Sequence, residues 1–236
     1  MRNDYFIFGD IDSRQYGVGI YGNQLAKMPQ RDQEYVSVPG RNGNLVLDNG
    51  KYHNVTIPYK AYIIKNYNEN VRGLRNALLE KHGYQRLEDT INPDEYRMAR
   101  ALPFEPNEIG VLQAAEFEIS FDCMPQRFLK IGEVPLEVVT SANIFSEYKQ
   151  PALPLIIAYG TGSFTINDVT IEITTANSYT DIDCELQEAY KDTLATNCNG
   201  NIVLTNGVFP TLTKGNNAIS MTGITKLIIY PRWWIL

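Results

Sequence analysis

Cysteine, histidine and tryptophan are scarce in this 236-residue chain, which has three, two and two of them. Cys123, Cys184 and Cys198 are odd in number and lack the CxxC spacing of a zinc site. They are predicted to be buried, reduced thiols, and a Cys184–Cys198 disulfide is not expected in a reducing compartment. His53 and His82 lie in no motif with a nucleophile or a second metal ligand, so neither is a candidate for catalysis or metal binding.

Long apolar runs are also missing, because no stretch approaches the roughly 20 residues needed to span a bilayer. Residues 1–10 lack the apolar core and cleavage site of a signal peptide, so the protein is expected to stay in the compartment where it is made, without entering a membrane. The net charge is −6, and the 21 basic residues are scattered. Sequence-specific binding to nucleic acid is therefore not expected.

Motifs of catalysis are absent as well: there is no GxSxG, HExxH, P-loop or dinucleotide fingerprint. The sequence therefore predicts no catalytic residue, no cofactor-binding residue and no metal ligand, and we interpret the protein as a non-enzyme. Hydrophobic residues make up 44% and charged residues 20%, which is typical of a soluble globular chain.

Alternating apolar and polar residues dominate what is present, and this period of two predicts half-buried strands. In residues 115–123 the apolar side chains fall on one face and the acids and serine on the other. A second such strand is predicted at 55–63, where Pro58 implies an edge position or a bulge, because proline cannot donate to the ladder. Further strands are predicted at 163–166 and at 169–173, joined by a turn at Asn167-Asp168.

One segment has helical spacing instead, and it predicts a single helix at about residues 70–82. Asn70 is expected to cap its start and Gly83 to end it, while His82 is expected to act as a cation at its C-terminus. The apolar stripe is formed by Val71, Leu74 and Leu78.

The proline-bounded stretch 125–154 separates two different compositions and predicts two domains. We expect an N-terminal β domain with the helix at 1–130 and an all-β sandwich, rich in Asn, Gly and Thr turns, at 131–236. The predicted fold class is therefore mainly β with one helix (α+β).

An acidic segment at residues 181–185 is the best candidate for hidden chemistry. As a strand it would place Asp181, Asp183 and Glu185 on one face and Ile182, Cys184 and Leu186 on the other. Three acids in line could bind calcium or serve a glycosidase. The favoured interpretation is a solvent-facing or interface side of a strand, because no loop supplies converging ligands.

Two other segments have structural interpretations. Residues 40–44, Gly-Arg-Asn-Gly-Asn, lack the lysine and helix of a phosphate loop and predict a tight β-turn between strands at 35–38 and 45–47. Trp233 and Trp234 are adjacent, so in a strand only one can join any sugar-stacking platform. We expect one to pack in the core and the other to make an interface or domain contact.

Several short motifs follow one another along nearly the whole chain: Tyr16-Gly17-Val18, Val38 to Gly43, the helix Val71 to Leu79, Phe121 to Pro125, Thr180 to Glu185 and Ile228 to Trp234. Their order resembles the distal tail (Dit) protein family of phages with long non-contractile tails. Asn42, where an acid is common, and the double tryptophan depart from the family pattern.

The resemblance implies a helix-bearing N-terminal β domain with a protruding hairpin, and a galectin-like C-terminal β-sandwich. It also implies a homohexameric ring at the virion tail tip that lets DNA pass, made in the host cytoplasm. Its expected partners are its own copies, the tail tube protein, the tail-associated hub protein and receptor-binding proteins. Two rival hypotheses remain open at this point: a carbohydrate-binding module of a cell-wall-recognising tail protein, and a hydrolase centred on the acids of residues 181–185.

Overall fold

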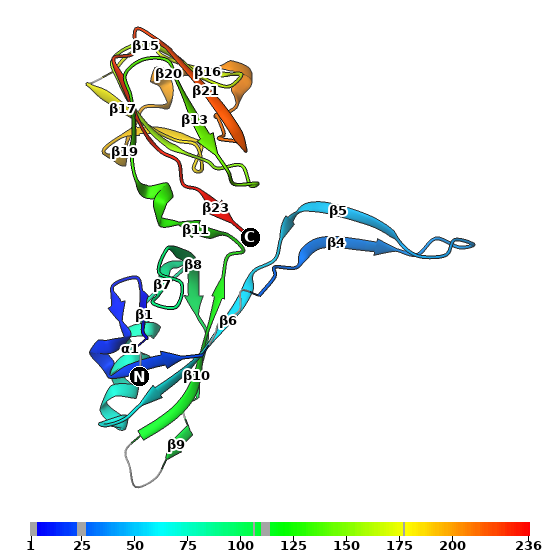
Figure 1. The fold of residues 1–236 in the computed structure, drawn as a ribbon, viewed down its shortest axis with the longest axis vertical. Coiled ribbons are helices and arrows are strands. Elements are labelled where there is room, and N and C mark those ends of the chain that lie inside the picture. Colours follow the sequence, from blue (N-terminus) through cyan, green and yellow to red (C-terminus); the bar gives the residue numbers. More distant parts are fainter. Residues whose placement is uncertain (1–3, 23–26, 106, 110–113, 177) are drawn as a thin grey trace. The chain divides into compact units, whose positions relative to one another are not determined.

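The computed structural model describes residues 4–22, 27–105, 107–109, 114–176 and 178–236. The chain divides into two compact units, unit 1 (residues 1–127 with Leu236) and unit 2 (residues 128–235), each with its own hydrophobic core (Figure 1). The described residues are mainly β with a single α-helix, as the sequence predicts. The ring-forming and galectin-like characters expected of the two domains stay predictions.

Unit 1 is built around one antiparallel sheet in the order β2-β1-β7-β8-β10-β6-β3, with β9 pairing with β10. Asp4, just before β1, pairs with Ile20 of β3, so the sheet curls until strands from opposite ends of this order are hydrogen-bonded. The strands are β1 (Phe6–Phe8), β2 (Ile11–Asp12), β3 (Val18–Tyr21), β6 (Val55–Ile63), β7 (Gln85–Asp89), β8 (Glu95–Ala101), β9 (Asn107–Ile109) and β10 (Ala114–Cys123), with the 3-10 helix η1 (Ser13–Tyr16).

The two strongest sequence patterns, β6 and β10, are neighbours in this sheet and pair from Val55↔Cys123 to Ile63↔Ala115. Every second residue of each strand is buried, which confirms the predicted alternation. Pro58 pairs with Ser120 without a register shift, whereas β3 pairs with β6 only over Lys60–Ile63 in the described residues. Pro58 therefore lies at a local edge, one of the two positions the sequence allowed.

The helix α1 (Tyr67–Leu79) begins and ends about three residues earlier than predicted. Asn66 is the N-cap residue, and Asn70 lies inside the helix, where its side-chain amide donates to the Lys65 carbonyl at 3.1 Å. Tyr67 extends the buried stripe one turn toward the N-terminus, which explains the earlier start. The predicted caps Asn70 and Gly83 were therefore wrong, and His82 lies beyond the helix end.

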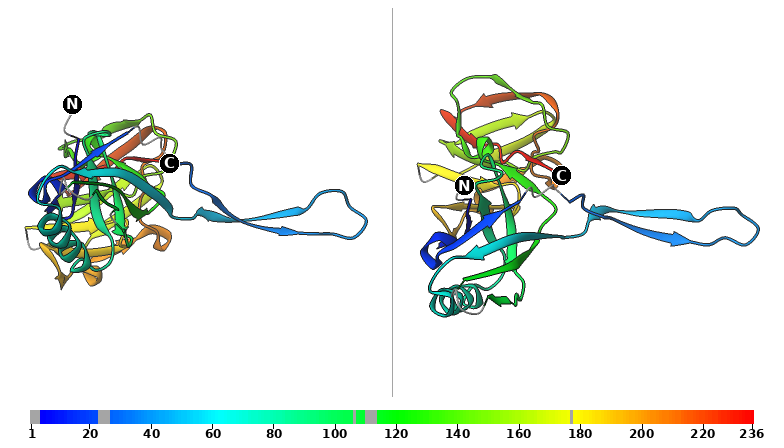
Figure 2. Two further views of the ribbon diagram at one scale, coloured as in Figure 1. Left: turned by 90° about the horizontal axis from the view of Figure 1, so that it is seen from below. Right: turned by 60° about the horizontal axis from the view of Figure 1, so that its bottom comes forward.

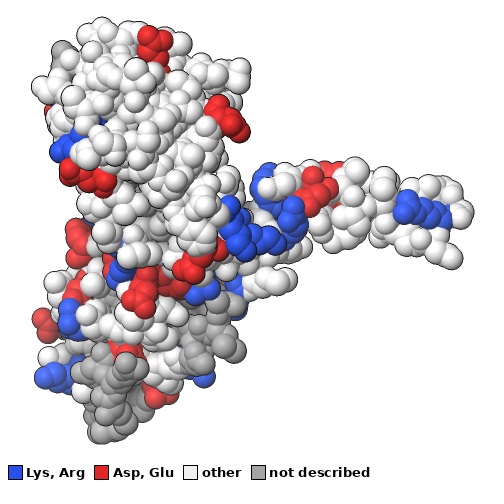
Figure 3. Space-filling view, turned by 45° about the horizontal axis from the view of Figure 1, so that its top comes forward, with Lys and Arg blue, Asp and Glu red and all other residues white. Residues whose placement is uncertain are grey.

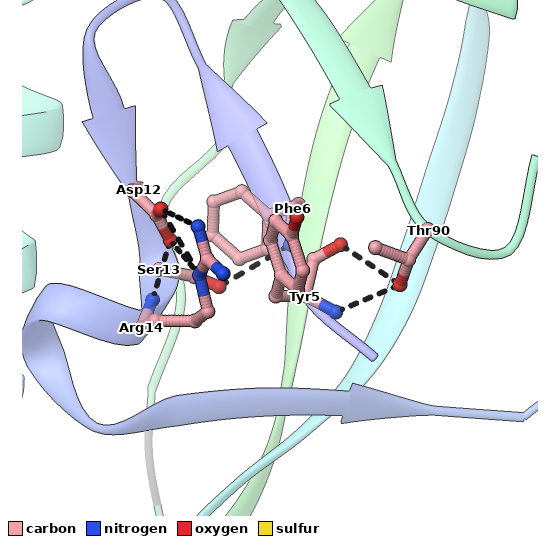
Figure 4. A network of polar contacts seen from close by, with 6 residues as sticks. All are labelled: Tyr5, Phe6, Asp12, Ser13, Arg14 and Thr90. Atoms are coloured by element: carbon pink, nitrogen blue, oxygen red, sulfur yellow. Dashed lines mark hydrogen bonds and ion pairs between the residues drawn. The ribbon is translucent and has the colours of Figure 1, made fainter. Parts of the chain in front are cut away.

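A polar network holds the chain on both sides of β1 (Figure 4). The buried Ser13 hydroxyl accepts from the Phe6 backbone N–H at 3.2 Å, and the Thr90 hydroxyl accepts from the Tyr5 N–H at 3.1 Å. The Asp12 carboxylate accepts from the Arg14 backbone and guanidinium, and that guanidinium stacks on the Tyr5 ring. The short strand β1 is thus anchored by side chains as well as by its ladder.

Unit 2 is a β-sandwich of two antiparallel sheets, β12-β22-β14-β17-β18-β19 and β13-β21-β15-β16-β20, which share one core. The predicted hairpin is confirmed, because β15 and β16 are joined through Asn167 and Asp168, with Asn167 at φ 54°. The first sheet comprises β12 (Leu136–Val138), β14 (Leu155–Tyr159), β17 (Tyr179–Asp183), β18 (Glu188–Lys191), β19 (Thr193–Asn197) and β22 (Lys226–Tyr230). The second comprises β13 (Ala142–Ser146), β15 (Gly162–Ile166), β16 (Val169–Ile173), β20 (Ile202–Leu204) and β21 (Gly215–Thr222).

The C-terminal segment returns to the beginning of unit 2. β23 (Trp234–Ile235) follows Trp233, whose carbonyl accepts from the N–H of Leu129 in β11 (Arg127–Leu129) at 2.8 Å. A Cβ on Gly132 would lie 2.4 Å from the Trp233 backbone nitrogen, so only glycine permits this approach. The remaining short elements are the 3-10 helices η3 (Lys130–Glu133), η4 (Asn199–Asn201) and η5 (Thr205–Gly207).

Candidate assembly surfaces

A two-stranded hairpin of β4 (Arg31–Val36) and β5 (Leu45–Tyr52) forms its own small sheet in unit 1. Figures 1 and 2 show it extending from unit 1 as a ribbon, with no layer of other described elements of unit 1 on either face. The connection is the loop 37–44, longer than the tight turn predicted for residues 40–44. It contains one β-turn, closed by the Arg41 N–H to the Val38 carbonyl, and left-handed glycines at 40 and 43. The longer loop follows from pairing that stops at Val36↔Leu45.

Apolar side chains on both faces of this hairpin are exposed to solvent. Cross-strand partners share a face, so Glu34, Val36, Leu45 and Leu47 lie on one side and Gln33, Tyr35, Val46 and Asp48 on the other. The exposed fractions include 42% for Val36, 45% for Leu47, 47% for Val46 and 63% for Tyr35. The residue pattern predicted strands here, and a protruding hairpin was implied only by the family resemblance, because alternation does not show whether a face has a partner.

Charged side chains of both signs gather toward the base of the hairpin, and largely uncharged surface follows toward the tip (Figure 3). Arg31 pairs with Asp48 and Lys51 pairs with Asp32 at 3.2 Å, and His53 lies 3.6 Å from Asp32. The hydrogen bond from Lys51, followed by that from Asn49, lowers the pKa of Asp32. These exposed pairs connect the two strands at the base of the hairpin.

The acidic segment of β17 differs from its prediction. Asp181 and Asp183 are 7% and 2% exposed rather than solvent-facing, and the strand ends at Asp183. The backbone N–H groups of Glu185 and Leu186 donate to Asp183 Oδ1 at 3.0 and 3.1 Å, so the chain turns there. Glu185 and Leu186 consequently leave the sheet, and both are exposed. The predicted two-faced row of six residues was therefore wrong beyond Asp183.

A partner that sequence analysis missed explains the buried Asp183. Arg232 Nη1 and Nη2 donate to its two carboxylate oxygens, both at 2.8 Å, and Arg232 adopts a left-handed backbone at φ 55°. Burial opposes ionisation of Asp183, but the Arg232 hydrogen bonds and the two backbone donors outweigh it and lower its pKa. Asp181 accepts only from the Asp192 N–H at 2.8 Å in the described residues, and burial raises its pKa.

The three cysteines and the two tryptophans were also singled out in the sequence. All three cysteines are buried and free, as predicted, and burial raises the pKa of Cys123 and of Cys184 to about 12. Trp233 is 6% exposed and packs against Tyr148, whereas Trp234 is partly exposed and donates its Nε1–H to the Pro151 carbonyl at 3.0 Å. The prediction that one tryptophan packs in the core is confirmed, and Trp233 is not available as a sugar platform.

The described residues contain no group of three or more His, Cys, Asp or Glu side chains arranged to hold a metal ion. No helix among them has the length and hydrophobicity to cross a membrane.

A curled sheet carrying one helix and an unpartnered hairpin, followed by a β-sandwich, defines a two-unit β protein with surfaces suited to assembly. Residues 11–123 match the family described as phage tail protein RIFT-related domain. No curated protein matches the chain. The solved Dit (gp 19.1) protein of phage SPP1, described as a paradigm of the hub adsorption apparatus in phages that infect Gram-positive bacteria, has a similar fold. Its TM-score is 0.72 at 10% identity, covering 96% of this chain and 97% of that one.

Chains of the phage P2 baseplate in its activated conformation are also similar. The calcium-containing structure gives a TM-score of 0.52 at 13% identity, covering 97% of this chain and 98% of that one. The strontium-containing structure gives 0.52 at 12% identity, covering 96% and 97%. Residues 11–123 therefore match a phage tail protein RIFT-related domain, and the chain as a whole has the fold of the solved SPP1 Dit protein.

Proposed function

We propose that the protein is a distal tail, or baseplate hub, subunit that assembles into a homohexameric ring at the virion tail tip. The ring joins the tail tube to the host-adsorption apparatus and leaves a channel for DNA, and the protein acts without catalysis. The observation that carries the proposal is the similarity of fold to the SPP1 distal tail protein along 96% of this chain, both units included.

The exposed hairpin supports assembly on physical grounds. An isolated two-stranded ribbon is at best marginally stable in water, and three strands or a covering layer are normally needed. β4 and β5 have neither in the described residues, yet they expose five large apolar residues, Tyr35, Val36, Leu45, Val46 and Leu47, and the loop between them exposes Val38. Apolar surface of this kind marks a site of protein interaction.

The proposed ring closes through heterologous contacts, in which one patch of a subunit meets a different patch on its neighbour. Its further partners are the tail tube protein, the tail-associated hub protein and receptor-binding proteins. The net charge of −6 agrees with a channel that repels the phosphates of passing DNA, and no sequence-specific contact with DNA is part of the proposal. The protein is made in the host cytoplasm and remains in the virion, without entering a membrane.

Light scattering across a concentration series, combined with electron microscopy of the largest species, tests the proposal. We expect a species of six times 26.8 kDa with a ring of sixfold symmetry. Where the free protein stays monomeric, adding the tail tube or hub protein of the same phage should template the ring, because association must first offset lost rotational and translational freedom. A protein that stays monomeric with both partners present would refute the proposal.

A further inference from the structure

Four Asn-Gly dipeptides occur in this chain, and the fold gives them two kinds of environment. They are Asn42-Gly43, Asn49-Gly50, Asn199-Gly200 and Asn206-Gly207. An asparagine side chain reacts most readily with its own backbone when glycine follows, because glycine has no side chain to obstruct the attack and its backbone rotates freely. The four sites share this reactive sequence, so a difference in their reactivity has to come from the fold.

The reaction in question is a cyclisation followed by hydrolysis. The backbone nitrogen of the glycine gives its proton to hydroxide and attacks the side-chain carbonyl carbon of the asparagine. A new C–N bond forms, the C–N bond of the side-chain amide breaks, and ammonia leaves with a proton taken from water. Water then opens the resulting succinimide at either of its carbonyl groups and produces aspartate or isoaspartate. The net change is water consumed and ammonia released, without oxidation or reduction.

Asn49-Gly50 is restrained at both reacting groups. The Gly50 N–H donates to Asp48 Oδ1 at 2.8 Å, so the nitrogen that would attack is occupied. The Asn49 side-chain amide donates to Asp32 Oδ1 at 3.3 Å, on the opposite strand of the hairpin. Both residues also lie within β5, between residues that pair with β4, and this pairing restricts the backbone rotation that ring closure requires.

Asn199-Gly200 is restrained through its side chain. The Ala189 N–H donates to Asn199 Oδ1 at 2.6 Å, and Asn199 Nδ2 donates to Glu188 Oε2. Both atoms of the amide are thus held by residues of β18. The side chain cannot turn toward the Gly200 nitrogen without breaking both hydrogen bonds, which leaves their partners unsatisfied.

Asn42-Gly43 and Asn206-Gly207 lack these restraints. Both asparagine side chains are exposed, and neither forms a hydrogen bond with the described residues. Asn42 lies in the loop 37–44 at the end of the hairpin (Figure 1), and Asn206 lies in η5 with a left-handed backbone at φ 60°. A Cβ placed on either glycine would meet nothing within 4 Å, so both sites are open. Local motion of one short segment is enough to bring the reacting groups together.

We propose that Asn42 and Asn206 are modification sites that convert spontaneously to aspartate or isoaspartate in the folded protein, whereas Asn49 and Asn199 persist. Conversion at Asn42 changes the charge of its loop. Arg41 is the one charged residue in loop 37–44, and a carboxylate beside it makes the loop neutral. Isoaspartate also lengthens the backbone, between left-handed glycines at 40 and 43. Neither asparagine belongs to a hydrophobic core, so both units stay folded after conversion.

Incubation of the folded full-length protein in ¹⁸O-labelled water at pH 8 tests the proposal. Each conversion incorporates a labelled oxygen, which distinguishes it from conversion before the experiment. Cleavage after lysine gives peptides 28–51 and 192–214, and each contains one open and one restrained site, so fragment-ion mass spectrometry compares the two within one molecule. Asn42 should convert at least about tenfold faster than Asn49, and Asn206 faster than Asn199 by a similar factor, because hydrogen bonds must first break at the restrained sites.

The same incubation in denaturant is the control. All four asparagines should then convert at similar rates, because the fold no longer distinguishes them. Equal rates at the open and restrained sites of the folded protein would overturn the proposal, and so would a difference that persists unchanged in denaturant. This comparison needs no variant, so it does not depend on the folding of any substituted chain.

Two substitutions test the physical cause. Asn42→Gln lengthens the side chain and disfavours ring closure, so it should abolish conversion at residue 42 and leave Asn206 unchanged. Glu188→Ala removes a partner of the Asn199 amide and should raise the rate at Asn199 several-fold. The matched control is Glu137→Ala, an exposed acid on β12 at the opposite edge of the same sheet. An Asn199 as slow in Glu188→Ala as in the parent, with unchanged thermal melting, would refute hydrogen bonding as the source of protection.

Discussion

The two buried aspartates of β17 should respond in opposite ways to neutralisation. Asp183 and Asp181 lie two residues apart on one strand, yet the pKa of Asp183 is lowered and that of Asp181 is raised. Asp183→Asn removes the charge that Arg232 and two backbone N–H groups neutralise. Asp181→Asn removes a charge that burial disfavours, and the amide oxygen can still accept from Asp192. We therefore expect a large loss of stability from the first substitution and little change from the second.

The magnitude follows from the burial of the ion pair. Removing one partner of a buried pair costs about 3–5 kcal/mol, because the other charge is left uncompensated. The Arg232 side chain keeps 23% exposure, and asparagine still accepts from the backbone, so we expect the lower end, about 3 kcal/mol. For a domain of this size that lowers Tm by roughly 10–20 °C. Asp181→Asn should stay within about 1 kcal/mol of the parent.

The pH dependence supplies an independent check of sign. A carboxyl whose pKa is lowered on folding stabilises the fold above its unfolded value of about 3.9, and this stability is lost as pH falls through the folded value. The deficit of Asp183→Asn should therefore be full at pH 7 and shrink below about pH 4. Differential scanning calorimetry of the unit 2 transition measures both effects. Equal losses from the two substitutions, or a deficit that persists unchanged at low pH, would refute the reasoning.

Three further substitutions or reagents test the two cores. Leu74→Ala, at a fully buried helix position, should destabilise unit 1 by about 2–5 kcal/mol in chemical denaturation. Gly132→Ala should destabilise unit 2 by more than 1 kcal/mol, because its Cβ would lie 2.4 Å from the Trp233 nitrogen. The thiols of Cys123 and Cys184, with pKa values near 12, should resist alkylation at pH 8 in the folded protein, as read by mass spectrometry.

Matched controls separate these effects from nonspecific damage. Leu79→Ala removes a leucine from the same helix at a position 65% exposed and should cost less than about 1 kcal/mol. Gly200→Ala introduces a Cβ with nothing within 4 Å and should be nearly neutral. Alkylation in denaturant should modify every thiol. The packing argument is wrong if either control matches its test variant, and the burial argument is wrong if the folded protein is alkylated at the denatured rate.

The strands of unit 1 could be predicted because apolar residues at every second position of a strand all lie on the same face of the sheet. β6 and β10 are half-buried along their whole length, so sequence and structure agree residue by residue. The start of α1 could not be predicted in the same way. Asn66 lies in the left-handed region and makes no side-chain cap, and the first turn is mostly polar, so the local signal pointed to Asn70. Burial of Tyr67 against the core, a tertiary effect, decides the start.

The acidic segment shows a different limit of sequence analysis. Its alternation is genuine through Asp183, but its environment depends on Arg232, which is 49 residues away in the chain. The alternation of apolar and polar residues along a strand indicates which residues share a face, but it does not indicate what covers that face. The same limit applies to the hairpin. Its two strands were predicted and are present, but no described part of the chain covers either face.

The two hydrophobic cores and the exposed hairpin differ in how much apolar surface they bury. Each unit has a hydrophobic core formed by residues of a single chain. The strands that contribute to these cores are stabilised by the apolar side chains they bury. β4 and β5 gain little from either core, because the large apolar side chains in residues 35–47 are at least 37% exposed. A ribbon of this kind has few buried contacts to resist local opening. The proposed assembly would account for these exposed apolar residues, because the fold of the single chain leaves them without a covering layer in the described residues.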